Sequence, residues 1–277
     1  FNPDAYDEDT DRVLNNLSNG DKEIREILLE AIGYCLWRRN ELGICFISTG
    51  DKANGKSTFI TMLREVLGAE NCTSLDLKDL GDRFSTASLN GALANLGDDI
   101  GDAWIPADEV AVFKKIVTGN EVKAEWKGQD VFFFRPYTKL FFSANTVPRM
   151  DDRTGAVKRR LIIIPFQRTF TKNDPDYDPY IIDKITTENA CEYILAMAIP
   201  RLTRVLSNRE FSKCSAADHE MEAYQIRNSS TLQWLEDEGL DKEDFAKTND
   251  SAVGGPYSRA VNTTISCLDG SSSGTPS

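Results

Sequence analysis

The spacing of hydrophobic residues changes several times early in the chain. Apolar side chains recur at helical spacing in residues 21–38, and Asp21 stands at the position expected of an N-cap. The run ICFIST at residues 44–49 is short, β-branched and aromatic, which is typical of a buried strand. Residues 56–68 return to helical spacing and stop at Gly68, a natural C-cap. The pattern predicts a strand and a helix joined by a glycine-containing loop.

The rest of the chain continues this alternation of strand-like and helix-like segments. The expected elements are a strand at residues 93–96, a helix at 106–119, a β-hairpin at 121–134 with its turn at Lys127 and Gly128, strands at 139–145 and 161–166, and helices within 177–235. The clearest of the late helices is 188–206. Strands that alternate with helices predict an α/β fold with a parallel central sheet and flanking helical segments.

Composition limits the possible classes of protein. The chain has 277 residues, of which 40% are hydrophobic and 27% charged, so it can bury a sizeable core. No apolar run approaches the roughly 20 residues of a membrane helix, so we expect no membrane partner and a cytoplasmic location, that of the host cell if the chain is viral. The start at Phe1 lacks an initiator Met and a signal-like region, which suggests a cut within a longer polypeptide.

Cysteine and histidine usage excludes several kinds of chemistry. The six cysteines show no C-x-x-C spacing, which argues against a zinc site or a disulfide framework and favours reduced thiols. His219 is the single histidine, so histidine-based catalysis and histidine-rich metal sites are nearly excluded. Chemistry must therefore depend on carboxylates, lysine, arginine and hydroxyls.

The net charge of −12 conceals a basic segment. Residues 110–170 contain twelve basic and five acidic residues, a net charge of +7, which leaves −19 for the rest of the chain. An acidic protein is a poor non-specific coat for nucleic acid. A basic block within it is either a solvated face or an anion-binding surface confined to one place. The basic residues are Lys114, Lys115, Lys123, Lys127, Arg135, Lys139, Arg149, Arg153, Lys158, Arg159, Arg160 and Arg168.

The loop between the first predicted strand and its helix has the P-loop pattern G-x-x-x-x-G-K-[ST]. Such a loop points backbone N–H groups and a helix N-terminus at phosphate oxygens, so we expect Lys56 to reach the β- and γ-phosphates and Ser57 to supply a hydroxyl to Mg²⁺. A chance glycine-rich turn is a weaker reading, because a strand precedes the loop and a helix follows it. The predicted cofactors are ATP and Mg²⁺, held by Gly50, Asp51, Lys52, Ala53, Asn54, Gly55, Lys56, Ser57 and Thr58.

Five further positions are candidates for catalysis. Asp98 and Asp99 follow the predicted strand at 93–96, and we assign Asp98 to the metal and Asp99 to the attacking water, although an Asp-rich turn would look similar. Asn145 ends a strand, where its amide could orient the water or simply form a turn. Paired arginines precede the last strand, and they could act across a subunit boundary or lie on an ordinary surface. These are Arg159 and Arg160.

The predicted hairpin offers Lys123 and Lys127 at and near its tip. A hairpin with lysines there is a poor core element and a good contact for the phosphates of a nucleic acid. A surface hairpin with solvated lysines is an equally good reading of the sequence alone.

The four segments GDKANGKST, ANLGDDI, FKKIVTGNEVKAEWKGQ and LFFSANTVPRMDDRTGAVKRRLIIIPF follow one another in a specific order. This order resembles the superfamily 3 helicases, specifically the helicase domain of phage and plasmid primase-helicases and their poxvirus relative. The resemblance covers residues 20–205, and four ordered motifs are far more specific than a P-loop alone. It implies a P-loop NTPase core of AAA+ type and an ATP hydrolase that acts as a DNA helicase in the replication of a viral or mobile-element genome.

The resemblance also implies a role for each motif. In the family pattern, Gly50, Gly55, Lys56 and Ser57 match Walker A, Asp98 and Asp99 match Walker B, residues 120–134 match the DNA-contacting hairpin, Asn145 matches sensor 1, and Arg159 or Arg160 matches the arginine finger. Family members form hexameric rings around single-stranded DNA, which would place the basic segment in the channel and leave the outside acidic. A primase domain would be fused to the chain or work beside it.

The implied organisation has four parts. They are residues 1–40 as a helical lead-in that ends a preceding collar-like region, 41–170 as the ATPase core, 171–240 as C-terminal helices, and 241–277 as a diverged or truncated, largely flexible tail. Relatives usually continue into a winged-helix module after a helix like residues 229–240, and this sequence departs from that pattern.

Three other functions compete with the helicase interpretation. A non-translocating AAA+ initiator or loader would share the fold and differ in unwinding. A monomeric P-loop phosphotransferase would need an acceptor pocket and a lid, and it would leave the lysine hairpin and the arginine pair unexplained. An assembly module with a decayed ATPase fits poorly with an intact Lys56, Ser57, Asp98 and Asn145 set.

Overall fold

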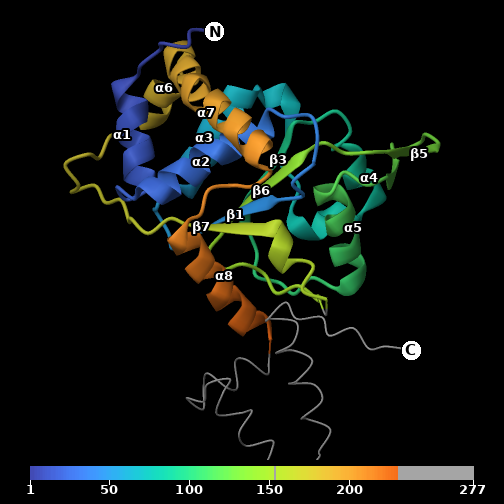
Figure 1. The fold of residues 1–277 in the computed structure, drawn as a ribbon. Helices are drawn as coiled ribbons and strands as arrows, with labels where there is room; N and C mark the ends of the chain where they lie inside the picture. Colours follow the sequence, from blue (N-terminus) through green and yellow to red (C-terminus); the bar gives the residue numbers. More distant parts are fainter. Residues whose placement is uncertain (153, 230–277) are drawn as a thin grey trace, which may run out of the picture.

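Five parallel strands form the central sheet of the computed structural model, which describes residues 1–152 and 154–229 (Figure 1). Their order across the sheet is β2-β3-β6-β1-β7, and every pairing is parallel. A separate antiparallel pair, β4 and β5, forms a hairpin. The strands are β1 (Cys45–Thr49), β2 (Cys72–Thr73), β3 (Ala94–Ile100), β4 (Val122–Glu125), β5 (Val131–Phe134), β6 (Lys139–Ala144) and β7 (Leu161–Pro165).

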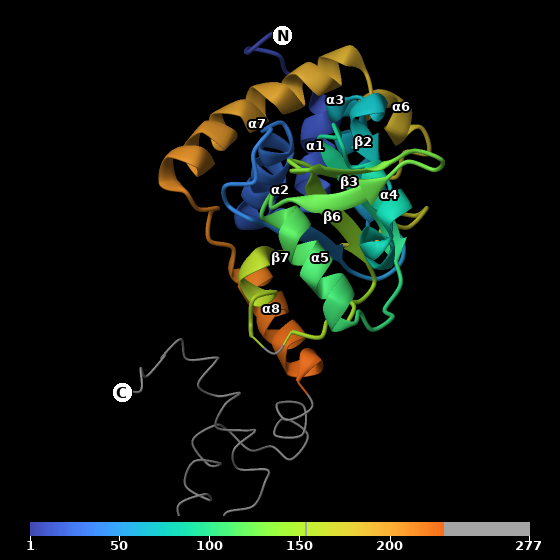
Figure 2. The same cartoon turned by 90° about the vertical axis from the view of Figure 1, so that its right-hand side faces the viewer.

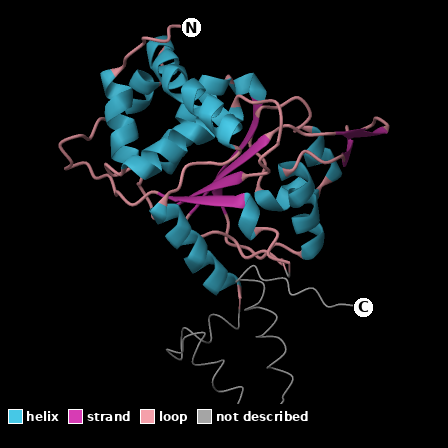
Figure 3. Cartoon of the chain, viewed as in Figure 1, coloured by secondary structure: helices cyan, strands magenta, loops and turns pink. Residues whose placement is uncertain are grey.

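Helices cover both faces of this sheet (Figures 2 and 3). Successive side chains of a strand point to opposite faces, so Phe46 and Phe141 belong to one hydrophobic core while Ile47 and Phe142 belong to the other. The first core also receives α1, α2, α3, α6 and α7, the second receives α5, and α8 contributes to both. The helices are α1 (Glu8–Leu17), α2 (Lys22–Cys35), α3 (Lys56–Leu67), α4 (Arg83–Ala87), α5 (Ala107–Val117), α6 (Ile181–Ile185), α7 (Glu188–Asn208) and α8 (Ser215–Asn228).

The predicted α/β class with a parallel central sheet and flanking helices is therefore confirmed. The predicted helical face of residues 21–38 is buried, and Asp21 caps that helix by accepting hydrogen bonds from two backbone N–H groups. The strand predicted at 93–96 is longer than expected and continues to Ile100. Helix α1 was not predicted individually, although Asp7 caps it by accepting from the Thr10 N–H at 2.8 Å.

Several predictions lie outside the described residues. They are the helix at 229–240 beyond its first position, the tail at 241–277, Arg153 and Cys267. The other five cysteines are free thiols, as their spacing indicated.

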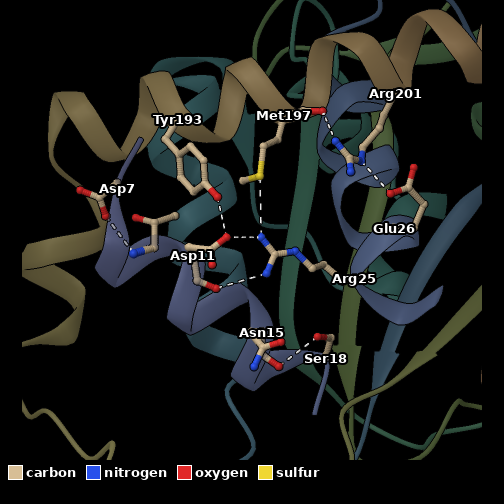
Figure 4. A network of polar contacts seen from close by, with 10 residues as sticks. Asp7, Asp11, Asn15, Ser18, Arg25, Glu26, Tyr193, Met197 and Arg201 are labelled. Atoms are coloured by element: carbon tan, nitrogen blue, oxygen red, sulfur yellow. Dashed lines mark hydrogen bonds and ion pairs between the residues drawn. The ribbon is translucent and has the colours of Figure 1, made fainter. Parts of the chain in front are cut away.

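A polar network joins α1, α2 and α7 (Figure 4). Arg25 donates to the Asp11 carboxylate and lies 3.8 Å from the Met197 sulfur, and Tyr193 donates to Asp11 at 2.5 Å. Burial alone would raise the pKa of Asp11, but the hydrogen bonds from Tyr193 and Arg25 outweigh burial and hold that pKa below its ordinary value. The network holds α1 against α2 and α7, and Leu17 at the end of α1 lies beside Gly55, the residue that precedes α3.

Candidate nucleotide-binding site

The loop between β1 and α3 requires glycine at two positions. Gly50 has φ +145°, and a Cβ there would lie 2.0 Å from the Asn54 Nδ2 and 2.5 Å from the Phe166 carbonyl oxygen. Gly55 has φ +88°, and a Cβ there would lie 2.3 Å from the Leu17 side chain. Both positive φ values favour glycine. The loop therefore curls tightly against neighbouring segments, and side chains at these positions would open it.

The N-terminus of α3 has no side-chain cap, because Gly55 is its N-cap. The first N–H groups of a helix have no intrahelical partner, and the helix dipole favours negative charge beside them. An uncapped helix start that follows a glycine-rich loop is a ready anion-binding site. Residues 51–58 supply most of the lining of an open cavity of about 460 Å³ at this point.

Lys56 is the first residue of α3, and its side chain turns back toward the backbone of the loop. Its Nζ donates to the Asp51 carbonyl oxygen at 2.9 Å, to Asn54 Oδ1 at 3.1 Å and to Asn145 Oδ1 at 3.5 Å. Burial lowers the pKa of Lys56, and the carboxylates of Asp99, Asp51 and Asp98 oppose that effect. The positive charge is thus held over the cavity by carbonyl and amide oxygens that a phosphate group could replace.

Asp98 and Asp99 lie within β3 rather than after it, which corrects the strand end expected at Leu96. The pairing of β3 with β6 shifts register between Gly97 and Ile100, so the two acids occupy an irregular step, and Asp99 has φ +52°. A bulge of this kind re-aims side chains at a strand end. Both side chains are exposed to the cavity that the phosphate loop lines.

Ser143 of β6 fixes this step, and the sequence interpretation missed it. Its hydroxyl donates to Asp98 Oδ1 at 2.5 Å and accepts from the Asp99 N–H at 2.8 Å. Ser143 is fully buried and comes two residues before Asn145. The available signal was a hydroxyl residue in the apolar run LFFSA, two positions before Asn145. Alternate residues of a strand point to the same face, so Ser143 and Asn145 are expected on the same side.

The structure therefore brings together the residues predicted for phosphate, metal and water. The cavity is lined by Asp51, Lys52, Ala53, Asn54, Gly55, Lys56, Ser57, Thr58, Asp98, Asp99, Ser143 and Asn145. They come from the carboxyl ends of three adjacent strands, β1, β6 and β3. This edge is where open α/β sheets bind ligands. Asn54 anchors the loop there, because its Nδ2 donates to the Phe166 carbonyl oxygen at 2.9 Å.

The oxygen atoms that line this cavity suit a hard divalent cation as ligands. Mg²⁺ prefers carboxylate and hydroxyl oxygens, keeps several waters, and is usually bound by one or two protein groups together with substrate phosphates. The Ser57 hydroxyl and the Asp98 carboxylate are groups of this kind in one cavity. Among the described residues there is no cluster of three or more His, Cys, Asp or Glu, so a cage made only of protein ligands is not what the described part of the chain offers.

The paired arginines lie at the other end of the sheet, beside the amino ends of the strands. They immediately precede β7, which runs parallel to β1 with Cys45 opposite Leu161, so they stand at the amino ends of these strands. Arg160 is half-buried and donates to the Ala156 carbonyl oxygen at 2.6 Å, and burial lowers its pKa. Arg159 is exposed and lines a different cavity, with Lys158 and Lys213. Neither arginine lines the phosphate cavity of its own chain.

The hairpin predicted at 121–134 is present, with its tip at residues 126–130 (Figure 1). Val122 and Ala124 are buried toward the body of the protein, and Lys123 and Lys127 are exposed. The sequence pattern of residues 131–134 predicted only the second strand of this hairpin. In the structure the Phe133 side chain is 61% exposed, and the Trp126 ring stacks on Phe132 with centroids 6.2 Å apart.

The basic segment is not one continuous surface, which corrects the expectation that it lines a channel as a whole. Lys139 is 1% exposed, and its Nζ donates to the Trp37 and Tyr137 carbonyl oxygens at 2.5 and 2.7 Å. Burial lowers its pKa to about 8. Lys114 pairs with Asp152 at 3.6 Å. These two lysines hold the fold together, so the exposed basic residues of the segment are fewer than its composition suggests.

Comparison with known families places the matched region around this site. Residues 48–160 match the model described as "Family of unknown function (DUF5906)", a match that spans less than half of the chain. It begins at the phosphate loop and ends at the arginine pair. A protein of Acanthamoeba polyphaga mimivirus, named "Putative helicase L207/L206", is 30% identical over 161 residues, which are 55% of this chain and 16% of that protein.

Solved structures share the fold at low sequence identity. An A form apo structure of the NrS-1 C terminal region has a TM-score of 0.59 and 13% identity, covering 95% of this chain and 66% of that one. A second apo structure of this region has a TM-score of 0.62 and 13% identity, covering 94% of this chain and 63% of that one. The chain thus spans under two thirds of these structures and a small part of the mimivirus protein. No helix in the described residues is long and apolar enough to cross a membrane.

Proposed function

We propose that this chain is the motor domain of an ATP-dependent DNA helicase of superfamily 3 type, which translocates along single-stranded DNA during replication of a viral or mobile-element genome. The observation that carries the proposal is the convergence of Lys56, Asp98 and Asn145 on one cavity at the carboxyl ends of three adjacent strands. The similarity to a mimivirus protein named as a helicase agrees with it.

In this proposal the residues of the cavity have different roles in phosphoryl transfer. The N–H groups of the loop and of the α3 N-terminus hold the phosphate oxygens, and Lys56 exchanges its carbonyl partners for the β- and γ-phosphates. Ser57 and Asp98 would hold Mg²⁺, which supplies charge neutralisation between these phosphates when bound. Asp99 and Asn145 orient the attacking water.

The proposed arginine finger is Arg159 rather than Arg160. Sequence alone left the two equivalent, but Arg160 is half-buried and bound to the Ala156 carbonyl oxygen, whereas Arg159 is exposed. Arg159 lies at the amino ends of the strands, and the cavity lies at their carboxyl ends. In this proposal Arg159 can therefore reach only the nucleotide site of a neighbouring subunit. This geometry supports a ring, and we propose a homo-hexamer of AAA+ type.

The proposed DNA contact is the β4–β5 hairpin. Lys123 and Lys127 would neutralise phosphates, a sequence-independent contribution to affinity. Exposed Phe133 offers a face on which a base can stack, as aromatic side chains do in proteins that bind single strands. The chain enters the hairpin from the C-terminal end of α5 and leaves it shortly before β6 begins. The hairpin base therefore lies at the amino ends of the strands, as Arg159 does. A primase domain, fused to this chain or working beside it, would supply primer synthesis.

Strand separation distinguishes this function from its alternatives. A forked DNA duplex with a single-stranded tail, incubated with ATP and Mg²⁺, should be unwound by the assembled protein and left intact when ATP is omitted. A loader or initiator would hydrolyse ATP on this DNA without unwinding it. A monomeric phosphotransferase would show turnover independent of DNA and of protein concentration, which would overturn the proposal.

A further inference from the structure

Asp152 is a nearly buried carboxylate that lies outside the phosphate cavity, and its side chain is 4% exposed. One carboxylate oxygen accepts from the Val157 N–H at 2.5 Å, and the other accepts from the Thr154 hydroxyl at 2.8 Å. Burial alone would raise the pKa of Asp152, but these hydrogen bonds outweigh burial and hold that pKa below its ordinary value. Asp152 therefore keeps a negative charge within the segment that leads to Arg159.

The hydrogen bond to Val157 fixes the backbone from which Arg159 projects. Val157 is the N-cap of the short 3₁₀ turn Lys158–Arg160 and is 1% exposed. Its own side chain does not cap the turn, whereas Asp152 holds its N–H in place. The Arg160 N–H then donates to the Val157 carbonyl oxygen at 2.8 Å. The backbone around Arg159 is thus anchored on both sides, while the Arg159 side chain is exposed.

Asp152 and its neighbours in the chain are also joined to α5. The Lys114 Nζ of α5 lies 3.6 Å from Asp152 Oδ1, and the Lys114 side chain is only 27% exposed, so salt screens this pair less than it screens a surface pair. A second contact lies just before α5. There the Ile105 N–H donates to the Arg149 carbonyl oxygen at 2.8 Å, and the Ile105 carbonyl oxygen accepts from the Asp151 N–H at 3.0 Å. The segment that leads to Arg159 is therefore joined to α5 and its start at two points.

Helix α5 connects these contacts to the proposed DNA hairpin. It ends at Val117, and the first strand of the hairpin begins at Val122. The connection is tight, because the Thr118 hydroxyl donates to the Lys114 carbonyl oxygen at 2.8 Å, and Val122 packs in the same core as Phe113 of α5. Protein interiors are close-packed and have low compressibility. A shift of the hairpin base is therefore transmitted through α5 to Lys114.

We propose that Asp152 is a positioning residue for Arg159, and that its ion pair with Lys114 makes the position of Arg159 respond to DNA bound at the hairpin. The inference rests on the proposed function, because it adds a residue to the mechanism in which Arg159 serves a neighbouring site. Asp152 acts through the backbone and contacts neither ATP nor DNA. A misplacement of about 1 Å at a reacting centre can lower the rate by about 100-fold. Loss of the Asp152–Val157 bond should therefore lower turnover and leave ATP affinity unchanged.

The turnover of assembled Asp152→Ala and Asp152→Asn proteins tests the positioning role. The first change removes the acceptor of the Val157 N–H, whereas the amide oxygen of the second can still accept it. We expect kcat to fall about 10-fold to 100-fold in Asp152→Ala, with unchanged ATP affinity, and much less in Asp152→Asn. In an Arg159→Ala background, Asp152→Ala should cause little further loss, since both changes remove the same contact. Lys56→Ala subunits, which keep Asp152, should restore part of the turnover of Asp152→Ala subunits.

Stimulation of turnover by single-stranded DNA tests the link through Lys114. Lys114→Met removes the charge and keeps the length of the side chain, and Lys115→Met is the matched control, because Lys115 is the exposed neighbour on the same helix. We expect Lys114→Met to bind DNA and to hydrolyse ATP without DNA as the wild type does. Its stimulation by DNA should fall by about 2-fold to 5-fold, as the loss of a partly exposed ion pair would give. Asp152→Asn should lose the same stimulation, and Lys115→Met should keep it.

The outcomes separate this inference from the function on which it rests. Unchanged turnover in folded Arg159→Ala would overturn the proposed arginine finger and this inference with it. If Arg159→Ala is inactive but folded Asp152→Ala turns over like the wild type, or if the losses of the two variants multiply when combined, Asp152 does not position Arg159. Equal DNA stimulation in wild type and Lys114→Met, or none in either, would overturn the link to the hairpin. Should Asp152→Ala fail to fold, the comparison of Asp152→Asn and Lys114→Met with Lys115→Met decides.

Discussion

The Ser143 hydroxyl donates to Asp98 Oδ1 at 2.5 Å across the boundary between β6 and β3. The Ser143 Oγ also accepts a hydrogen bond from the Asp99 N–H. One buried side chain therefore orients both acids where the register between β3 and β6 shifts. Mutation of a group that holds a metal ligand in this way typically lowers metal affinity or activity by about 10-fold to 100-fold. Ser143 is therefore a positioning residue in the proposed mechanism, acting through Asp98.

Replacing Ser143 should change the Mg²⁺ requirement of the enzyme. With Ser143→Ala we expect ATP turnover to fall 10-fold to 100-fold at ordinary Mg²⁺ concentrations and to recover partly at high Mg²⁺. Ser48→Ala is the matched control, because Ser48 is buried on the adjacent strand and its hydroxyl donates to the Phe142 carbonyl oxygen at 3.2 Å, away from the acids. A Ser143→Ala protein with an unchanged Mg²⁺ titration would remove Ser143 from the mechanism.

Replacing Arg159 and replacing Arg160 should have different effects, the first on ATP turnover and the second on stability. Arg159→Ala should lower ATP turnover by about 10³-fold with little change in ATP affinity, since arginine fingers act mainly on the transition state. Arg160→Ala should lower stability instead, because it removes the hydrogen bond to the Ala156 carbonyl oxygen. Lys158→Ala, which removes the neighbouring exposed cation, is the control.

Mixing experiments decide whether Arg159 acts between subunits. Arg159→Ala and Lys56→Ala subunits, each nearly inactive alone, should regain some turnover when combined, because intact Lys56 sites then lie beside intact arginines. If mixed rings form and no mixing ratio recovers activity, the shared-site geometry is wrong. Full specific activity in a dilute wild-type monomer would contradict it as well.

Lys127 at the hairpin tip should contribute to DNA affinity and not to DNA-free hydrolysis. With Lys127→Ala we expect weaker single-strand binding and a salt dependence whose slope is smaller by about one unit at most, since one phosphate contact is lost. Lys172→Ala, another exposed lysine outside the hairpin, is the control. Unaltered affinity and salt slope in assembled Lys127→Ala protein would leave the hairpin as a surface feature.

Buried Lys139 should make stability depend on alkaline pH. Its pKa in the folded protein is about 8, below the ordinary 10.5, so the unfolded chain binds more protons between these values. The contribution of Lys139 to the free energy of unfolding should therefore rise from about pH 8 to about pH 10.5, by at most about 3 kcal/mol. Cysteine and tyrosine residues titrate in the same range, so the measurement is the difference in unfolding free energy between wild type and Lys139→Met. A difference that stays flat with pH would show that folding does not lower the pKa of the Lys139 amine.

Local patterns predicted the elements that depend on near neighbours. The strand, loop and helix around Lys56 follow from a change of hydrophobic period and from two glycines, both of which are read within a few residues. Helix α1 was missed because its signal is a single cap, Asp7, before a strongly acidic first turn. The phosphate loop was thus predictable, while the packing of α1 beside Gly55 was not.

Long-range register explains the rest of what the sequence could not predict. The step at Asp98 and Asp99 arises from how β3 pairs with β6, and the role of Ser143 exists only once those strands are aligned. Lys139 looked like part of a basic surface, because composition does not reveal that its ammonium is enclosed by two carbonyls and the Tyr34 ring. The choice between Arg159 and Arg160 likewise depended on burial.

The ATP turnover of Lys56→Ala, measured with and without single-stranded DNA, tests the central proposal most directly. The Lys56 ammonium is the cation over the phosphate cavity, and its removal leaves the hydrophobic cores intact. We predict a folded protein in which turnover is lost and DNA does not restore it, whereas Lys172→Ala behaves like wild type and is stimulated by DNA. Unchanged turnover in a folded Lys56→Ala protein would contradict the assignment of this loop as the site of ATP hydrolysis.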